Sequence, residues 1–223
     1  MNASTLQDLP TATDHRAPPT ASPEIEAGVP PMASRRVALR PLTESDRGFL
    51  YELMTDPRAG GRVRFGGATP SPDKVAASLW DSVLAQFVIV GRDSGAPLGL
   101  AALTSPRFRD GHCYLSALGH PRAQRTGLVA EGVFLTCNYA FLTWPLRKIY
   151  MESTEQSLAH FDGGLDILFT EEGRLREHAF WNGEYQDVSI LAIYRETWAR
   201  QAKRFARHFL PADAARDLEQ RAR

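Results

Sequence analysis

The sequence predicts an α/β fold, a sheet flanked by helices, and three observations point to it. Short runs rich in β-branched and aromatic residues alternate along the chain with segments whose apolar residues recur at helical spacing. The strand-like run at 113–118 leads through an arginine-rich loop into an apolar, helix-like segment at 128–144. The dipeptide Asn182-Gly183 separates two strand-like runs, and both residues tolerate the positive φ that a type I′ hairpin turn requires.

The composition of the 223 residues is that of a globular protein. The 26 basic and 26 acidic side chains balance, so there is no overall field to hold nucleic acid or an anionic membrane. No apolar run approaches the roughly 20 residues of a membrane-spanning helix. Cys113 and Cys137 both lie in apolar runs, which favours core thiols in a reducing compartment over a disulfide or a paired-cysteine zinc site. Integral membrane and histone-like roles are excluded, and no metal site is expected.

Residues 1–34 are expected to form a disordered, mildly acidic tail. They hold six prolines among Ala, Thr and Ser, and four acidic side chains against one arginine. Such a segment buries too little apolar surface to offset the entropy of ordering it. It also lacks the basic start and apolar run of a secretory signal, so a cytoplasmic location is expected.

A strand and two helices are expected to follow the tail. The alternating run at 37–41 predicts the strand, and Thr43 with Asp46 forms a capping-box-like start for a helix that Pro57 ends. Ser71, followed by proline and aspartate, is typical of the N-cap of a second helix. The apolar residues that this second helix would carry are Val75, Leu79 and Val83.

The remaining elements are predicted from the same two periodicities. Further strands are expected at 87–90, 98–103, 113–118, 148–153, 174–181 and 185–194. Helices are expected at 128–144, at 156–167, over a basic amphipathic stretch at 195–208, and in a short charged tail.

This order of elements resembles that of the GNAT acyltransferases over about residues 36–200. The run Glu-Gly-Arg-Leu-Arg-Glu-His at 172–178, then Asn-Gly-Glu-Tyr-Gln-Asp at 182–187 and the late aromatic Trp198, is similar to the ending of the ribosomal-protein N-terminal acetyltransferase branch. The resemblance implies a GNAT fold, with a mixed, mostly antiparallel sheet of six to seven strands flanked by helices.

The resemblance also implies a division of the chain into three parts. The tail at 1–34 would precede a GNAT acyltransferase domain at 35–200, and a C-terminal helical extension would occupy 201–223. The oligomeric state stays open, and a homodimer is one alternative, because the final hairpin leaves an unpaired strand edge through which two copies could pair.

The acyl-CoA loop of the superfamily, Gln/Arg-x-x-Gly-x-Gly/Ala, corresponds here to Gln-Arg-Thr-Gly-Leu-Val at 124–129, followed by Glu131. Such a loop directs backbone N–H groups at a pyrophosphate from a helix N-terminus. Val129 departs from the pattern, and its β-branched side chain is expected to crowd a phosphate. The resemblance implies acetyl-CoA or another acyl-CoA as co-substrate, held by Leu118, Gln124, Arg125, Thr126, Gly127, Leu128, Val129 and Ser157.

Three residues are candidates for the chemistry of amine acylation. Glu152 matches a strand glutamate that in relatives helps to deprotonate the amine, whereas the position of the helix tyrosine that protonates the leaving thiolate is Gly164 here. Histidine side chains in general change charge near neutral pH, so His160 is a candidate acid or relay. Tyr114 lies on the fourth expected strand, which lines the acceptor cleft in the family. Each also fits a structural role: a solvated strand-end acid, a helix-surface histidine and a packed aromatic.

The leading functional hypothesis is an N-acyltransferase that moves an acetyl or other acyl group from acyl-CoA to a primary amine of a small metabolite or of a protein N-terminus. Two alternatives stay open. One is a GNAT-like enzyme that takes its acyl group from aminoacyl-tRNA, with the basic stretch at 195–208 as the tRNA contact. The other is a GNAT-fold binding protein without catalysis.

Overall fold

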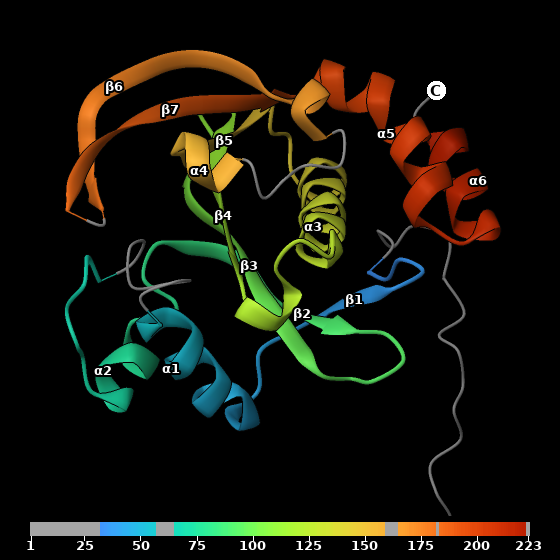
Figure 1. Ribbon diagram of the computed structural model, residues 1–223. Helices are drawn as coiled ribbons and strands as arrows, with labels where there is room; N and C mark the ends of the chain where they lie inside the picture. The colour runs from blue at the N-terminus through green and yellow to red at the C-terminus, as the bar shows by residue number, and fades with distance from the viewer. Residues whose placement is uncertain (1–31, 57–64, 159–164, 182, 222–223) are drawn as a thin grey trace, which may run out of the picture.

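A seven-stranded sheet in the order β1-β2-β3-β4-β5-β7-β6 forms the centre of the protein (Figure 1). The computed structural model describes residues 32–56, 65–158, 165–181 and 183–221. All neighbouring strands are antiparallel except β4 and β5, so the expected mixed, mostly antiparallel sheet is confirmed. The strands are β1 (Val37–Arg40), β2 (Val83–Gly91), β3 (Pro97–Arg107), β4 (His112–Gly119), β5 (Lys148–Ser153), β6 (Thr170–Trp181) and β7 (Glu184–Tyr194).

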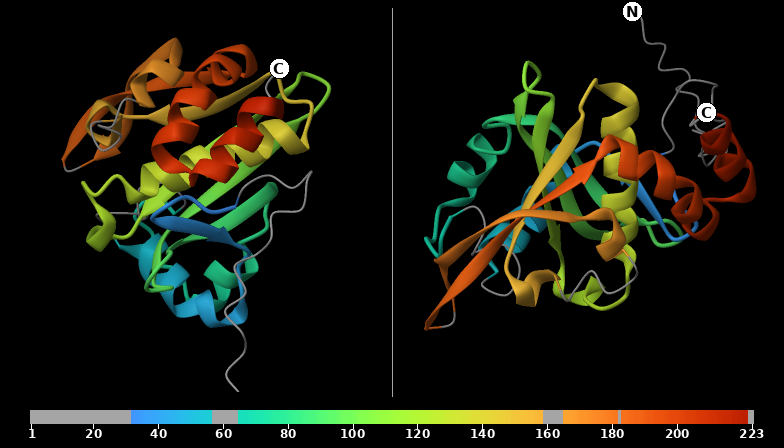
Figure 2. Two further views of the ribbon diagram at one scale, coloured as in Figure 1. Left: turned by 90° about the vertical axis from the view of Figure 1, so that its right-hand side faces the viewer. Right: turned by 90° about the horizontal axis from the view of Figure 1, so that it is seen from above.

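The helices form a layer on each face of this sheet (Figure 2). They are η1 (Glu44–Asp46), α1 (Arg47–Thr55), α2 (Pro72–Ala77), η2 (Pro121–Ala123), α3 (Leu128–Thr143), α4 (Glu155–Leu158), η4 (Leu165–Leu168), α5 (Arg195–Phe209) and α6 (Ala212–Arg221). The helices α1 and α2 pack with Leu100 of β3 and Leu118 of β4 in one apolar cluster. Cys113 and Leu115 point to the opposite face of β4 from Leu118. They belong to the second and larger apolar cluster, the main core, to which α3 and α5 also contribute.

Two predicted helix starts are confirmed, and one predicted helix is shorter than expected. The capping box of Thr43 and Asp46 is formed, and Ser71 Oγ accepts the N–H of Lys74 at 3.3 Å. The expectation that this second helix extends through Val83 is wrong, because α2 ends at Ala77. Residues 78–82 form turns instead of a further helical turn, Ser82 adopts a left-handed φ of +56°, and Val83 pairs with β3.

The expected helix at 156–167 lies partly outside the described residues. The described part of this segment consists of α4 and the short helix η4, and residues 159–164 between them lie outside the described residues. The sheet edge at which a homodimer was expected is β6, and pairing of two copies there stays a prediction.

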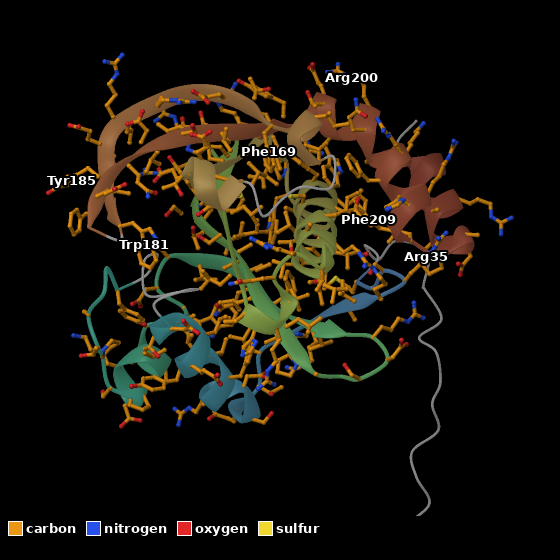
Figure 3. The ribbon with its side chains drawn as sticks, in the orientation of Figure 1. Arg35, Phe169, Trp181, Tyr185, Arg200 and Phe209 are labelled. Atoms are coloured by element: carbon orange, nitrogen blue, oxygen red, sulfur yellow. The ribbon has the colours of Figure 1, made fainter. Side chains whose placement is uncertain are left out.

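The helix α5 contributes to the main core on both sides of residue 200. The Phe134 side chain of α3 is 1% exposed, and its ring centroid lies 5.0 Å from that of Trp198, 5.4 Å from that of Phe209 and 6.1 Å from that of Phe205. Figure 3 shows Phe209 on α5, on the side of the molecule remote from the tip of the β6–β7 hairpin. The division of the chain at residues 34 and 200 stays a prediction.

The two cysteines are free and buried, as expected of core thiols. Burial raises the pKa of Cys113 to about 12 and the pKa of Cys137 further still, so neither thiol is a thiolate near neutral pH. In the described part of the chain, no helix is long and apolar enough to span a membrane. Nor do three or more His, Cys, Asp or Glu side chains gather there into a metal-binding group.

Acid is expected to weaken the fold through Asp46, whose buried carboxylate accepts two hydrogen bonds of 2.7 Å from Arg40 and one of 2.8 Å from the Thr43 N–H. These bonds, the Arg40 pair foremost, lower the pKa of Asp46 from 3.8 to about 2. Because its pKa is lower in the folded chain than in the unfolded chain, the carboxylate stabilises the fold above about pH 4, and the effect is lost as the pH falls through about 2.

The variant Asp46→Asn is therefore expected to lower the free energy of unfolding by about 2 kcal/mol at pH 7 and by about half as much at pH 3. Urea unfolding of parent and variant at both pH values measures this. An equal loss at the two pH values would show that the ionised carboxylate is not the cause.

Candidate active site

The strands β4 and β5 diverge and open a gap in the middle of the sheet. They pair only where His112–Tyr114 face Lys148–Tyr150, after which β4 continues to Gly119 and β5 to Ser153 without further pairing. Beyond Tyr114, β4 pairs with β3 on one side only, so alternate N–H groups of residues 115–118 face the gap. A sheet interior thus exposes hydrogen-bond donors that no strand uses.

A cavity of about 690 Å³ occupies this gap. Its walls are β4, the loop before α3, the end of β5, the start of α4, and the far end of the β6–β7 hairpin. The predicted site residues that line it are Tyr114, Leu118, Gln124, Arg125, Gly127, Val129, Glu152 and Ser157. Thr126 and Leu128 lie in the same loop without lining the cavity, and His160 lies outside the described residues. Predicted site residues from Tyr114 to Ser157 therefore meet at one cavity.

The loop before α3 contains two residues with left-handed φ and leads directly into the helix N-terminus. Gly127, the N-cap of α3, has a left-handed φ of +75°, and Arg125 has a φ of +59°. The 16-residue helix begins without a side-chain cap at this residue, and Thr126 Oγ1 accepts the N–H of Leu128 at 3.2 Å. The first N–H groups of a helix carry partial positive charge and bind phosphate when nothing else uses them. We refer to residues 124–129 as the donor loop.

Val129 lines the cavity, and its side chain packs against β4. A Cβ atom built on Gly119 of β4 would lie 2.9 Å from Val129 Cγ2, so the valine side chain packs where Gly119 has no side chain. The side chain also packs against the main core. The valine that sequence analysis expected to crowd a phosphate thus has room against β4.

Glu152 and Tyr114 stand on opposite sides of the gap. Glu152 is exposed near the end of β5 and is the one carboxylate among the described residues that line the cavity. The Tyr114 ring lies 5.4 Å from the Tyr150 ring, two residues before Glu152 on the same face of β5. An exposed carboxylate beside an opening is able to take a proton from an incoming ammonium group.

The β6–β7 hairpin is bent, and Trp181 lies near its tip (Figures 1 and 3). Residues 178–181 at the end of β6 line the cavity. Two irregularities in pairing interrupt the hairpin, between Glu171 and Gly173 and between Leu175 and Ala179. At the second, Glu177 adopts a φ of +48°, and its N–H donates to Asp187 Oδ1 at 2.9 Å. Bulges bend a strand, so this one directs the end of β6 toward the gap.

Glu172 ties the hairpin to β5 at the base of the gap. Both its oxygens accept from Lys148 Nζ at 2.9 Å, and one accepts from the Tyr150 hydroxyl at 2.6 Å; the Tyr194 hydroxyl is a further donor. These hydrogen bonds, those of Tyr150 and Tyr194 foremost, lower the pKa of Glu172 to about 2. The Glu172 carboxylate is ionised and hydrogen-bonded to residues of β5 and β7, so it anchors β6 to these strands.

Sequence analysis did not propose several residues that line the cavity: Thr104, Ser105, Thr154, His178, Phe180 and Trp181. His178 ends the run at 172–178 that carried the family resemblance, and that run was the available signal. Ser105 enters through a bulge in β3 with a φ of +48°, for which its residue type gives no indication.

Comparison with known proteins gives a family match and similar solved structures. Residues 36–158 match the family model described as "Acetyltransferase (GNAT) domain". The spermidine N-acetyltransferase of Vibrio cholerae in complex with CoA and spermine superposes with a TM-score of 0.64 and 22% identity, covering 73% of this chain and 97% of that chain. The spermidine/spermine N-acetyltransferase SpeG of the same organism, in complex with manganese ions, has a TM-score of 0.61 and 22% identity, covering 74% and 96%. A search of curated proteins found no match.

The family match covers the parts of the structure that form the gap. It runs from β1 through the donor loop and Glu152 to α4, and the solved structures share the fold. The expected GNAT fold, the acyltransferase activity and the acyl-CoA co-substrate are thereby confirmed, whereas the match does not extend to the ribosomal-protein branch. The chain belongs to the GNAT acetyltransferase family.

Proposed function

We propose that this protein transfers an acetyl group from acetyl-CoA to the primary amine of a small molecule. The observation that carries the proposal is that one cavity is lined by both the donor loop and Glu152. The donor loop would hold the pyrophosphate of CoA at the N-terminus of α3. Glu152, across the gap, would meet the amine.

The proposed reaction is direct transfer. Glu152 takes a proton from the ammonium group, and the free amine attacks the thioester carbonyl carbon, so that an N–C bond forms and the C–S bond breaks. Unpaired N–H groups of β4 stabilise the oxyanion of the intermediate. The leaving thiolate takes a proton from the Tyr114 hydroxyl, the described candidate acid that lines the cavity, and the second proton that the nitrogen loses as it becomes an amide restores this hydroxyl. His160 stays the alternative acid that sequence analysis proposes.

The lining of the cavity favours a monoamine with an aromatic or apolar body. Glu152 is the one carboxylate in its described lining, and aromatic rings of Tyr114, Phe180 and Trp181 contribute to it. The Vibrio cholerae structure contains spermine, which carries several ammonium groups. Each buried ammonium group needs its own anionic or hydrogen-bonding partner, so a single carboxylate suits a single amine.

A protein N-terminus is the second candidate acceptor. The run at 172–178, which is similar to the ribosomal-protein N-terminal acetyltransferases, lies on β6, and its last residue, His178, lines the cavity. A peptide would enter between this hairpin and β4 and present one amine to Glu152.

A thiol-release assay with acetyl-CoA tests the proposal. We expect turnover with 2-phenylethylamine and tyramine to exceed turnover with spermidine by at least about tenfold in kcat/KM, because the apolar body is buried. Faster acetylation of peptides with free N-termini would favour the second candidate. Consumption of charged tRNA without any use of acetyl-CoA would overturn both in favour of the tRNA-dependent alternative.

A further inference from the structure

An ion pair behind the donor loop joins it to Arg36, the residue immediately before the strand β1. Arg36 Nε donates to Glu131 Oε1 at 2.5 Å, and Arg36 Nη1 donates to the backbone oxygen of Thr126 at 3.2 Å. Arg36 Nη2 also contacts Glu131. The same guanidinium group thus binds α3 through a side chain and the donor loop through its backbone. Arg36 lies 90 positions before Thr126 in the sequence.

The partner carboxylate is firmly held. The Glu131 side chain is 3% exposed, and its second oxygen accepts from the Ser34 hydroxyl at 2.5 Å. Its N–H donates to the Gly127 backbone oxygen at 3.1 Å, which closes the first turn of α3. A buried carboxylate with all these partners gives Arg36 a rigid anchor, although the arginine itself is half exposed.

The bond to Thr126 sets the direction of the next amide. In a planar trans peptide unit, the C=O of one residue and the N–H of the next point to opposite sides. Because Arg36 holds the Thr126 carbonyl on its own side, the N–H of Gly127 points away from Arg36. Gly127 lines the cavity, and a Cβ atom there would lie 3.4 Å from Arg36 Nη2. An N–H that points away from Arg36, on a residue that lines the cavity, is able to meet a ligand bound there.

The loop conformation needs such support. Arg125 adopts a left-handed φ, which costs about 1 kcal/mol for a residue other than glycine. A loop with an unfavourable residue relaxes unless neighbouring groups hold it. A loop that must order itself on binding loses affinity to the entropy of ordering.

We propose that Arg36, anchored by Glu131, is a positioning residue that holds the Gly127 N–H toward the CoA pyrophosphate. This inference rests on the proposed function in that the donor loop binds the pyrophosphate of acyl-CoA. Arg36 acts from behind the loop, and its charge is neutralised by Glu131.

Calorimetry with CoA and with pantetheine, which lacks the pyrophosphate, tests the proposal. Arg36→Ala is expected to raise the Kd of CoA about tenfold, equivalent to about 1.4 kcal/mol, and to leave the Kd of pantetheine within about twofold. Arg36→Lys keeps a positive charge beside Glu131 but not the fork that also reaches Thr126, and the same selective loss is expected. If the alanine variant fails to fold, the lysine variant tests the same selective loss of CoA affinity.

Arg40→Ala is the matched control. Arg40 lies on β1 and forms a comparable pair with the buried Asp46, away from the donor loop. We expect it to lower the melting temperature and leave the Kd of CoA unchanged. The proposal is overturned if Arg36→Ala binds CoA as the parent does, if it weakens CoA and pantetheine equally, or if Arg40→Ala weakens CoA as much. A parent that binds pantetheine but not CoA would instead reject the pyrophosphate site of the proposed function, and the inference with it.

Discussion

Replacing Glu152 with glutamine is expected to lower kcat/KM for acetyl transfer by about 10²- to 10⁴-fold, the range for removal of a general base. The amide keeps the size of the side chain but cannot take the proton of the ammonium group. The Kd of CoA should stay within about twofold, since Glu152 lies on β5, across the gap from the donor loop. Steady-state kinetics with the best amine and calorimetry with CoA measure the two quantities.

The dependence of this defect on pH distinguishes a base from a structural acid. As the pH approaches the pKa of the amine, more of the amine is already deprotonated, so the defect of Glu152→Gln should shrink. Glu155→Gln is the control, because Glu155 is an exposed acid on α4 that does not line the cavity. A defect of the same size in both variants, or one that is constant with pH, would reject Glu152 as the base.

Phe134→Ala is expected to lower the free energy of unfolding by about 3 to 5 kcal/mol, the usual cost of deleting a buried phenyl ring. The ring joins α3 to Trp198, Phe205 and Phe209 of α5. Its loss leaves a cavity between the two helices. Urea unfolding, followed by the fluorescence of the tryptophans, Trp198 among them, measures the change in the free energy of unfolding.

Phe180→Ala is the matched control for this second prediction. Phe180 lies on the hairpin and is 63% exposed, so its removal should cost less than about 0.5 kcal/mol. Equal losses in the two variants would contradict the account of the core. The contacts of Phe134 also mean that truncation after residue 200 would remove Phe205 and Phe209 from the main core.

The order of elements and the loop between β4 and α3 were predictable because their signals are local. The capping box at Thr43, the N-cap at Ser71 and the strand, loop and helix around Gly127 each depend on residues within a few positions of one another. The spacing of Val75, Leu79 and Val83 misled the helix prediction. It fits a helical face, but Val83 is the first residue of β2, and only pairing with β3 reveals this.

The support of the site was not predictable, because it depends on long-range pairs. Arg36 is one of many arginines, and nothing near it in the sequence indicates Glu131, which lies 95 positions away. The bend of the hairpin arises at Glu177, and glutamate is not a residue type from which a positive φ is predicted. What supports a binding loop from behind is thus visible only once the chain is folded.

Calorimetry of CoA with the parent and with Gly127→Val tests the central claim most directly. We expect micromolar binding by the parent, about 8 kcal/mol, and at least tenfold weaker binding by the variant, because valine resists the φ of +75° and obstructs the loop. Gly95→Val is the control: Gly95 has a φ of +64° and open space around it, but it does not line the cavity. Binding by Gly127→Val that equals the parent's, or a loss shared with Gly95→Val, would contradict the assignment of the donor loop.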